Sequence, residues 1–184
     1  MFAEQGAAIY TLGIGDLFVE NLARWLEARE VEYLIDIRSP PYRIDRPELE
    51  PGALSKLLKA RETKYLNLNK QLGDRPKDIA LRSGGLIDYR RYRARAYARE
   101  GLERIEKAWE LGARICVLGR EADPVISHRA RLIGQELHER GYTIRHLTHQ
   151  GSRLMTHAEL LRVLWLTRDS IHTTSQPSGK PRTP

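Results

Sequence analysis

Short apolar runs of strand length alternate with helix-period patterns five times along this chain, and that alternation restricts the folds open to it. Alternating strands and helices predict a parallel sheet covered on both faces, with right-handed crossovers between strands. We therefore expect an α/β fold, Rossmann-like or flavodoxin-like, whose mostly parallel five-stranded sheet belongs to a single domain. The expected strands are Ile9 to Gly13, Val31 to Ile37, Tyr65 to Leu68, Ile115 to Leu118 and Tyr142 to Leu147.

The length of the chain and the composition of its end define the expected domain. A chain of 184 residues is long enough to bury one hydrophobic core. We assign residues 1–169 to the α/β domain. Residues 170–184 are mainly Ser, Thr, Pro, Gly and Lys, a composition typical of a disordered tail.

The charge balance bears on the partners of the chain. Lys and Arg number 31 against 24 Asp and Glu, and the net charge of +7 favours an anionic partner such as nucleic acid or a phosphorylated ligand. A basic soluble surface without such a partner explains the same count. The single cysteine, Cys116, excludes an intramolecular disulfide and a multi-cysteine metal site. Neither a signal peptide nor an apolar run of membrane-spanning length is visible, so we expect a cytoplasmic protein with no membrane partner.

The first helices carry recognisable start and packing signals. Asp16 is expected to cap the first helix, and Phe18 is expected to lie on its buried face. Pro51 is acceptable in the first turn of the second helix. Asp88 is expected to cap one long helix that runs to Gly112.

Later segments carry similar signals. Ile126 is expected to begin the buried face of a helix that Gly141 ends in a left-handed conformation. Thr156 and Glu159 have capping-box spacing before the last helix. The segment 69–87 lacks periodicity and predicts either a functional lid or a disordered loop.

The stretch Ala113 to Arg131 carries the main candidate site. It reads as a strand, a short polar loop and a helix, and open α/β sheets bind their ligands at such a loop, beside the helix N-terminus. The side chains expected near that crevice are Glu121, Ser127, His128 and Arg129.

Two other strands end in residues suited to the same crevice. Gly13 and Gly15 follow the first strand, and Asp36 and Arg38 close the second. In a parallel sheet these three blocks meet at one carboxyl edge. Structural alternatives stay open for each block: a tight turn at the glycines, a salt bridge between Asp36 and Arg38, or helix capping and loop pairing by Glu121 and its neighbours.

Two further clusters suggest nucleic-acid or metal binding. Arginines interleave with tyrosine in the segment after Asp88, which suits phosphate contacts with base stacking, although a solvated helix face explains the pattern equally well. His146 and His149 alternate at the end of the last strand, but no acid at fixed spacing accompanies them, so we expect neither a metal nor a cofactor. The candidate nucleic-acid contacts are Arg90, Arg91, Tyr92 and Arg95.

Several sequence blocks resemble the domain-of-unknown-function family 488. The resemblance covers roughly Ile9 to His149, and the most specific block is EADPVISHR at Glu121 to Arg129, where the family has a Glu, a Pro and a Cys-His-Arg. The other blocks are YTLGIGD at Tyr10 to Asp16, LIDIRSPP at Leu34 to Pro41 and YLNLNKQLG at Tyr65 to Gly73.

The chain departs from the family pattern at three places. Gly119 and Ser127 stand where cysteines are usual, and Ile14 with Gly15 replaces His-Ser. Any thiol chemistry of the family is therefore not expected here in the same form. The resemblance implies an α/β protein with a polar cleft and an association with nucleotide or nucleic-acid chemistry, including base excision.

These observations lead to one main hypothesis for function. Arg38 and Arg129 would hold phosphate, Tyr65 or Tyr92 would stack a base, and Asp36 or Glu121 would activate water for hydrolysis at a glycosidic or phosphate centre. A non-catalytic nucleic-acid or nucleotide binding module is the alternative, and rhodanese-like sulfur transfer is a third and weaker one. The substrate, the choice between DNA, RNA and free nucleotide, and the oligomeric state stay open.

Overall fold

A computed structural model describes residues 8–15, 17–41, 45–83, 86–148 and 153–173 of the chain. Among these residues a six-stranded sheet has the strand order β3-β2-β6-β1-β7-β8, and a separate two-stranded hairpin pairs β4 with β5. The strands are β1 (Ile9–Gly13), β2 (Tyr33–Asp36), β3 (Lys64–Asn67), β4 (Arg82–Ser83), β5 (Leu86–Ile87), β6 (Ile115–Gly119), β7 (Ile144–Leu147) and β8 (Leu154–Thr156).

The α/β fold with a mostly parallel sheet is confirmed. The five expected strands pair in parallel, whereas β8 joins the edge of the sheet antiparallel to β7. The sequence analysis missed β8, so the expected count of five strands is one too low. Three residues directly before a helix are too few to show a strand period.

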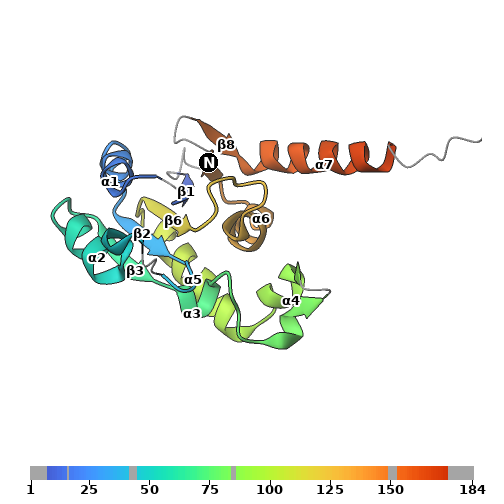
Figure 1. Ribbon diagram of the computed structural model, residues 1–184, viewed down its shortest axis with the longest axis horizontal. Coiled ribbons are helices and arrows are strands. Elements are labelled where there is room, and N and C mark those ends of the chain that lie inside the picture. The colour runs from blue at the N-terminus through green and yellow to red at the C-terminus, as the bar shows by residue number, and fades with distance from the viewer. Residues whose placement is uncertain (1–7, 16, 42–44, 84–85, 149–152, 174–184) are drawn as a thin grey trace, which may run out of the picture.

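The helices cover both faces of the sheet, as Figure 1 shows. Helices α1 and α2 pack on one face, and α5 and the η3–α6 helix pack on the other. The helices are α1 (Val19–Glu27), α2 (Pro51–Lys59), α3 (Asn69–Leu72), α4 (Tyr89–Arg93), α5 (Ala96–Glu110), α6 (Gln135–Glu139) and α7 (His157–Thr173), with short turns η1 (Pro47–Leu49), η2 (Ile79–Leu81) and the π-helical η3 (Ala130–Gly134).

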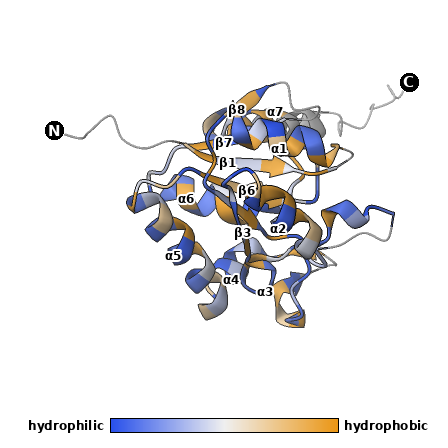
Figure 2. Cartoon of the chain, turned by 90° about the vertical axis from the view of Figure 1, so that its left-hand side faces the viewer, coloured by the Kyte–Doolittle hydropathy of each residue, from blue (hydrophilic) through white to orange (hydrophobic). Residues whose placement is uncertain are grey.

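Strand alternation decides which side chains reach each face. In β2, Ile35 joins the core under α5, whereas Leu34 joins the core under α1 and α2. Cys116 lies in the second core and is fully buried, as expected from its position within an apolar strand. Helices α5 and α6 show hydrophobic and hydrophilic stretches in turn along their length in Figure 2, as helices with one buried face should.

Three expectations about the helices are wrong. Phe18 precedes α1 and is 69% exposed, and Ile126 is 63% exposed in the loop before the η3 helix. The long helix expected after Asp88 is two helices, because α4 ends at Arg93 and α5 begins at Ala96. Asp88 does cap α4, since its Oδ1 accepts the backbone N–H of Arg91 at 3.0 Å.

The segment 69–87 contains more regular structure than its sequence predicts. It holds α3, η2 and the β4–β5 hairpin, each too short to produce a readable period, with 84–85 outside the described residues. The expected disordered loop is therefore incorrect for the described part of this segment. Its residues instead form one wall of the candidate site.

The last elements follow their local signals. Gly141 has φ +91, as expected of a left-handed terminator, and Pro51 is the first residue of α2. Thr156 and Glu159 form the expected capping box, with the Glu159 N–H donating to Thr156 Oγ1 at 3.2 Å and the Thr156 N–H to Glu159 Oε2 at 2.7 Å. Helix α7 runs on to Thr173, past the expected start of the tail, and 174–184 lie outside the described residues. Within the described chain, no helix combines the length and apolar character needed to cross a membrane.

Candidate functional site at the carboxyl edge of the sheet

The three predicted blocks do meet at one edge of the sheet. Gly13 and Gly119 end neighbouring parallel strands in register, and Asp36 pairs with Leu118 on the other side of β6. Strand alternation nevertheless sends their side chains to different faces. Asp36 points toward the core of α1 and α2, like Leu34, whereas the residues after β6 lie on the face of α4 and η3.

Asp36 and Arg38 form a closed ion pair. The Arg38 side chain donates through Nε to Asp36 Oδ1 at 2.9 Å and through Nη2 to Asp36 Oδ2 at 2.6 Å, and its backbone N–H also donates to Oδ1 at 2.9 Å. Nη2 also donates to the carbonyl of Leu49 at 2.9 Å. Both side chains are buried, with exposed fractions of 0% and 2%. The pair therefore joins the end of β2 to η1, which is the structural alternative considered for these residues.

Tyr65 completes this buried group rather than facing a ligand. Its hydroxyl donates to Asp36 Oδ2 at 2.7 Å. Burial, together with the charge of Asp36 and this hydrogen bond, raises the pKa of Tyr65 well above its usual value. The hydroxyl thus stays protonated and fixed as a donor.

Arg129 holds the loop that follows β6. It is fully buried, and its Nη1 and Nη2 donate to the carbonyls of Glu121 and Ala122, while Nε donates to Thr11 Oγ1 at 3.2 Å. Burial lowers the pKa of Arg129 to about 10, against the opposing effect of the Glu121 charge, so the guanidinium stays charged at neutral pH. The guanidinium of Arg129, which was expected to bind phosphate, thus already donates to two backbone carbonyls and one hydroxyl of the protein.

The glycines after β1 permit the close approach of the same loop. A Cβ at Gly13 would collide with the carbonyl of Glu121, and one at Gly15 would lie 2.8 Å from Ala122 Cβ. Gly15 has φ +40, a conformation in which a side chain is strained. These glycines therefore serve a tight strand-to-loop contact, the alternative to a phosphate-binding turn.

Thr11 connects Arg129 by hydrogen bonds to a buried pair of histidines. Thr11 Oγ1 lies 2.7 Å from His146 Nδ1, His146 Nε2 lies 2.9 Å from His157 Nδ1, and His157 Nε2 lies 3.2 Å from Gln135 Oε1. Because Arg129 can only donate to Thr11, one consistent arrangement has each group donate to the next as far as Gln135. Gly134 makes room for it, since a Cβ there would lie 2.9 Å from both imidazoles.

His146 and His157, the two histidines of this hydrogen-bond network, are neutral at pH 7. Burial lowers the pKa of His146 to about 3, with the charges of His157 and Arg129 adding to the effect, and burial lowers the pKa of His157 to about 4. No group of three or more His, Cys, Asp or Glu within the described residues could hold a metal ion. The expected partner of His146, His149, lies outside the described residues.

Ser127 caps the helical segment that begins at His128 and continues into η3. Its hydroxyl donates to the carbonyl of Pro124 at 2.9 Å and accepts the backbone N–H of Ala130 at 3.2 Å. The side chain is fully buried. Its hydrogen bonds thus stay within the protein, although the sequence placed it among the ligand contacts.

Glu121 and His128 differ from all these residues because each has a buried atom with no partner. Glu121 Oε2 and His128 Nδ1 have no hydrogen-bond partner among the described residues. His128 Nε2 donates to the carbonyl of Leu72 at 2.9 Å, so Nδ1 is the acceptor of a neutral ring. Burial lowers the pKa of His128, while the nearby charges of Asp74 and Glu121 act in the opposite sense. The site thus contains two buried acceptors without donors.

Two tyrosines of α4 surround His128. The rings of Tyr89 and Tyr92 have centroids 5.5 and 5.7 Å from the His128 ring. Burial raises the pKa of Tyr89, and the carboxylates of Glu121 and Asp74 add to that effect against the charge of Arg131. Both tyrosines thus lie against the ring of His128.

Asp74 ties the loop after β2 to the loop after β6. It accepts the backbone N–H of Ser39 at 2.7 Å and the Nε of Arg120 at 3.1 Å. Arg120 also donates to the carbonyl of Pro40 at 2.9 Å. This bridge fixes the mouth of the site.

A basin of about 650 Å³ opens beside that bridge. Its cations are Lys70, Arg75 and Lys77, which form no ion pair with the described residues. Tyr92 lines the basin and its ring also packs against His128, whereas Glu121 and His128 are not among the lining residues. The hydroxyl of Tyr92 donates to the carbonyl of Gly73 at 2.8 Å. Tyr97 adds a half-buried ring. The remaining lining residues are Ser39, Pro40, Pro41, Asn69, Pro76 and Asp78.

The arginine-rich segment offers few free groups. Arg95 pairs with Asp78 at 2.7 Å, and Arg91 lies 3.4 Å from Asp88. Tyr92 is 1% exposed and is not available for surface stacking. Arg90 is exposed. Of the expected contacts, Arg90 and the 66% exposed Arg91 remain accessible.

The family model described as domain of unknown function DUF488 matches residues 19–135, more than half of the chain. This chain belongs to the DUF488 family. The match contains the loop after β2, the wall of the basin and the Glu121 to Arg129 block, and it leaves out the opening block before residue 19. No curated protein and no solved structure matches the chain.

Gly119 and Ser127, two departures of this DUF488 chain from the pattern that it resembles, each have a structural role in the fold. A Cβ at Gly119 would lie 3.0 Å from Arg129 Cδ, and Ser127 supplies the helix cap. Cys116 is buried in β6, and burial raises its pKa to about 12. No thiol therefore stands at the candidate site to replace the missing cysteines.

The sequence analysis missed the basin of this DUF488 site. Lys70, Arg75 and Lys77 belong to the segment read as a lid or a disordered loop, and Asp74 was not considered. The available signal was the three cations Lys70, Arg75 and Lys77 shortly after a strand end, although Asp74 and Asp78 stand beside two of them in the sequence. Tyr89 was noted only as part of the arginine-rich helix.

Proposed function

We propose that this DUF488 chain binds a phosphorylated nucleoside, free or within nucleic acid, and hydrolyses it at a glycosidic or phosphate centre with Glu121 as acid or base. The observation that carries the proposal is the pair of buried acceptors, Glu121 Oε2 and His128 Nδ1, for which the described part of the chain supplies no donor. Buried polar groups in folded proteins are almost always paired, so an exception of this kind supports a functional role.

The two acceptors favour a ligand rich in N–H or O–H groups. The amino group of a nucleobase and the hydroxyls of a ribose are such donors. Tyr89 and Tyr92 pack against the His128 ring, with centroids 5.5 and 5.7 Å away, and give this part of the site two aromatic rings. A ligand held here therefore presents donors to Glu121 and His128.

The basin favours an anion at the other end of the same ligand. Lys70, Arg75 and Lys77 are free to contact phosphate oxygens, and Tyr97 offers a ring face beside them. Acceptors inside and cations outside match a nucleotide, which carries donors on its base and sugar and charge on its phosphate. An anion without donors would leave the inner acceptors unpaired.

The catalytic part of the proposal rests on Glu121. Asp36, the other expected catalytic carboxylate, already accepts from Arg38 and Tyr65 on both oxygens. Glu121 keeps one buried oxygen without a donor among the described residues, and general acid-base catalysis needs a carboxylate within hydrogen-bond reach of the reacting group. In this proposal Arg129 positions Glu121 by holding its backbone carbonyl.

A non-catalytic binding module is the second candidate. The ion pair between Asp36 and Arg38 favours this candidate. Glycoside hydrolysis usually employs two carboxylates, and Asp36 is not free to act as the second one beside Glu121. Sulfur transfer is not proposed, since Cys116 is buried inside β6.

The binding step is tested by titrating AMP and a mixed-sequence single-stranded DNA against two double variants. Lys70→Gln with Lys77→Gln should weaken binding about tenfold or more, since each lost phosphate contact costs on the order of 1 kcal/mol. Lys56→Gln with Lys59→Gln on α2 removes the same charge away from the basin and should change affinity little. Equal losses in both variants would assign the binding to general charge and end the proposal.

The catalytic step is tested by incubating the protein with nucleotides and with normal, modified and single-stranded nucleic acids, and measuring released base, phosphate or cleaved strand. Glu121→Gln should reduce turnover by about two orders of magnitude or more and leave binding nearly intact. Asp123→Asn is the matched control, because Asp123 lies in the same loop and accepts the Val125 N–H at 2.8 Å, a contact that asparagine keeps. Binding without any turnover would establish the binding module instead.

A further inference from the structure

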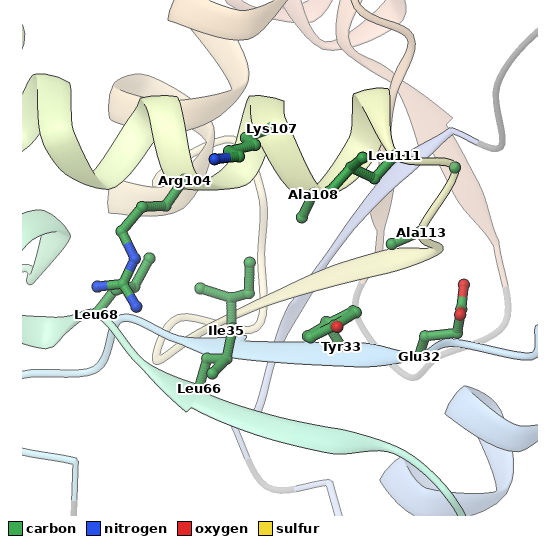
Figure 3. A pocket seen from close by; sticks show the side chains of 11 residues that line it. Glu32, Tyr33, Ile35, Leu66, Leu68, Arg104, Lys107, Ala108, Leu111 and Ala113 are labelled. Atoms are coloured by element: carbon green, nitrogen blue, oxygen red, sulfur yellow. The ribbon is translucent and has the colours of Figure 1, made fainter.

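A second hollow lies on the α5 face of the sheet, outside the proposed nucleotide site. It has a volume of about 420 Å³ and shares no lining residue with the basin. Ile35 and Leu66, from β2 and β3, form its floor, and Ala108 of α5 and Leu111 directly after α5 form its roof, as Figure 3 shows. Volumes of this size are typical of small-molecule sites.

The hollow exists because α5 leaves the edge of the sheet uncovered. Strand β3 is the last strand on this side and pairs only with β2 in the described structure. Leu66 is half-buried, and Leu111 is 79% exposed at the end of α5. The apolar lining is therefore available to a ligand.

Two cations lie at this hollow instead of pairing along their own helix. Glu100 and Arg104, and likewise Glu103 and Lys107, have the spacing that favours ion pairs on a helix. Neither pair forms in the described structure, and both Arg104 and Lys107 line the hollow. Figure 3 shows Arg104 reaching down from α5 toward Leu68.

The opposite end of the hollow is acidic. Glu32 lines it there, and its carboxylate accepts the backbone N–H of Arg114 at 2.9 Å. The hollow thus has a cationic end, an apolar middle and an anionic end. A carboxylate placed near Glu32 would be repelled, whereas one beside Arg104 gains a planar guanidinium partner.

We infer that this hollow binds a small apolar carboxylate, with its acid group on Arg104 and Lys107 and its hydrocarbon part along Leu66, Tyr33 and Leu111. The apolar part leaves water on binding, which supplies affinity, and the two cations fix the direction of the ligand. The proposed nucleotide site does not enter this inference, because the residues of the two sites are separate.

The experiment titrates decanoate into the uniformly ¹⁵N-labelled full chain and follows amide shifts. Decanol supplies the same tail without the charge, and butyrate supplies the same charge with a short tail. We expect decanoate to shift the amides of β2, β3 and the end of α5, and to bind more tightly than either control. Shifts located elsewhere, or decanol binding as tightly as decanoate, would overturn the inference.

Variants separate the two parts of the site. Arg104→Gln should weaken decanoate about tenfold and leave decanol unchanged, while Arg99→Gln, an exposed arginine of α5 outside the hollow, should affect neither. Leu111→Ser should weaken decanoate and decanol alike by about threefold, and its exposure makes the fold insensitive to it. Equal effects of Arg104→Gln and Arg99→Gln on decanoate would show general charge attraction and contradict the assignment.

Discussion

Asp36 and Glu121 follow neighbouring strands at the same edge of the sheet, yet their surroundings differ completely. Asp36 is fully buried and receives donors from the Arg38 side chain, the Arg38 backbone and the Tyr65 hydroxyl. Glu121 has a buried oxygen with no donor among the described residues. Position at a strand end is therefore not enough to indicate a ligand contact. A side chain that is already hydrogen-bonded within the protein is not available to a ligand.

The cations repeat this difference. Arg38 and Arg129 are buried and bonded to protein acceptors, so each stabilises a loop. Lys70, Arg75 and Lys77 line a basin and have no acidic partner in the described structure. Arg38 and Arg129, which the sequence suggested as phosphate ligands, are therefore structural. The unpaired cations of the basin lie in a segment whose sequence shows no periodicity.

The largest effect on stability is expected when the closed pair is broken. Asp36→Ala leaves the Arg38 guanidinium buried without its counter-ion, so the free energy of unfolding should fall by about 3–5 kcal/mol. Tyr65→Phe removes one hydrogen bond to the same carboxylate and should cost about 1 kcal/mol. Urea unfolding followed by circular dichroism measures both. A loss below about 1 kcal/mol for Asp36→Ala would contradict a closed structural pair.

A second effect on stability, which depends on pH, is expected from the hydrogen-bonded histidines His146 and His157. The folded state keeps the pKa of His146 at about 3 and that of His157 at about 4, whereas both are near 6.5 in an unfolded chain. Between those pH values the unfolded state binds more protons than the folded state. The stabilising contribution of the two histidines should therefore be fully present above about pH 7, and the free energy of unfolding should fall as the pH drops below 6.5.

The slope of that fall is at most about 1.4 kcal/mol per pH unit for each histidine. Urea unfolding at intervals from pH 8 to pH 5 measures it. His157→Gln removes one titrating group, and its amide nitrogen is able to donate to Gln135, so the slope should decrease. An unchanged slope in this variant would mean that His157 takes up its proton in the folded state.

The sequence predicted the fold well because the strands are long enough to show their period. The five parallel strands, the cap at Asp88, the capping box at Thr156 and the left-handed Gly141 each depend on neighbours within a few residues. Short elements such as β8 and α3 have no period to detect. The break between α4 and α5 is not marked by glycine or proline, so it was not expected.

The candidate site was predicted only in part, because the hydrogen-bond partners of its residues lie far away in the sequence. The place of the Glu121 block at the carboxyl edge follows from the parallel direction of the expected strands. Whether a polar group is free depends on distant partners, such as Tyr65 for Asp36 and Thr11 for Arg129. Those contacts span 29 and 118 residues, and no local pattern reports them.

The smallest effect on stability is expected at the other carboxylate. Glu121→Gln keeps the shape of the side chain and the backbone carbonyl that Arg129 holds, and it removes a charge whose Oε2 has no donor. The lost attraction to Arg129 and the relieved cost of burying an unpaired oxygen oppose each other, so the free energy of unfolding should change by less than about 0.5 kcal/mol. Urea unfolding of Glu121→Gln beside Asp36→Asn makes the comparison with matched chemistry, since each variant replaces a carboxylate by its amide. Asp36→Asn should cost several-fold more, because asparagine turns an NH₂ toward the donors of Arg38 or Tyr65. If Glu121→Gln is as destabilising as Asp36→Asn, Glu121 is a structural residue as well, and the contrast between the two strand ends fails.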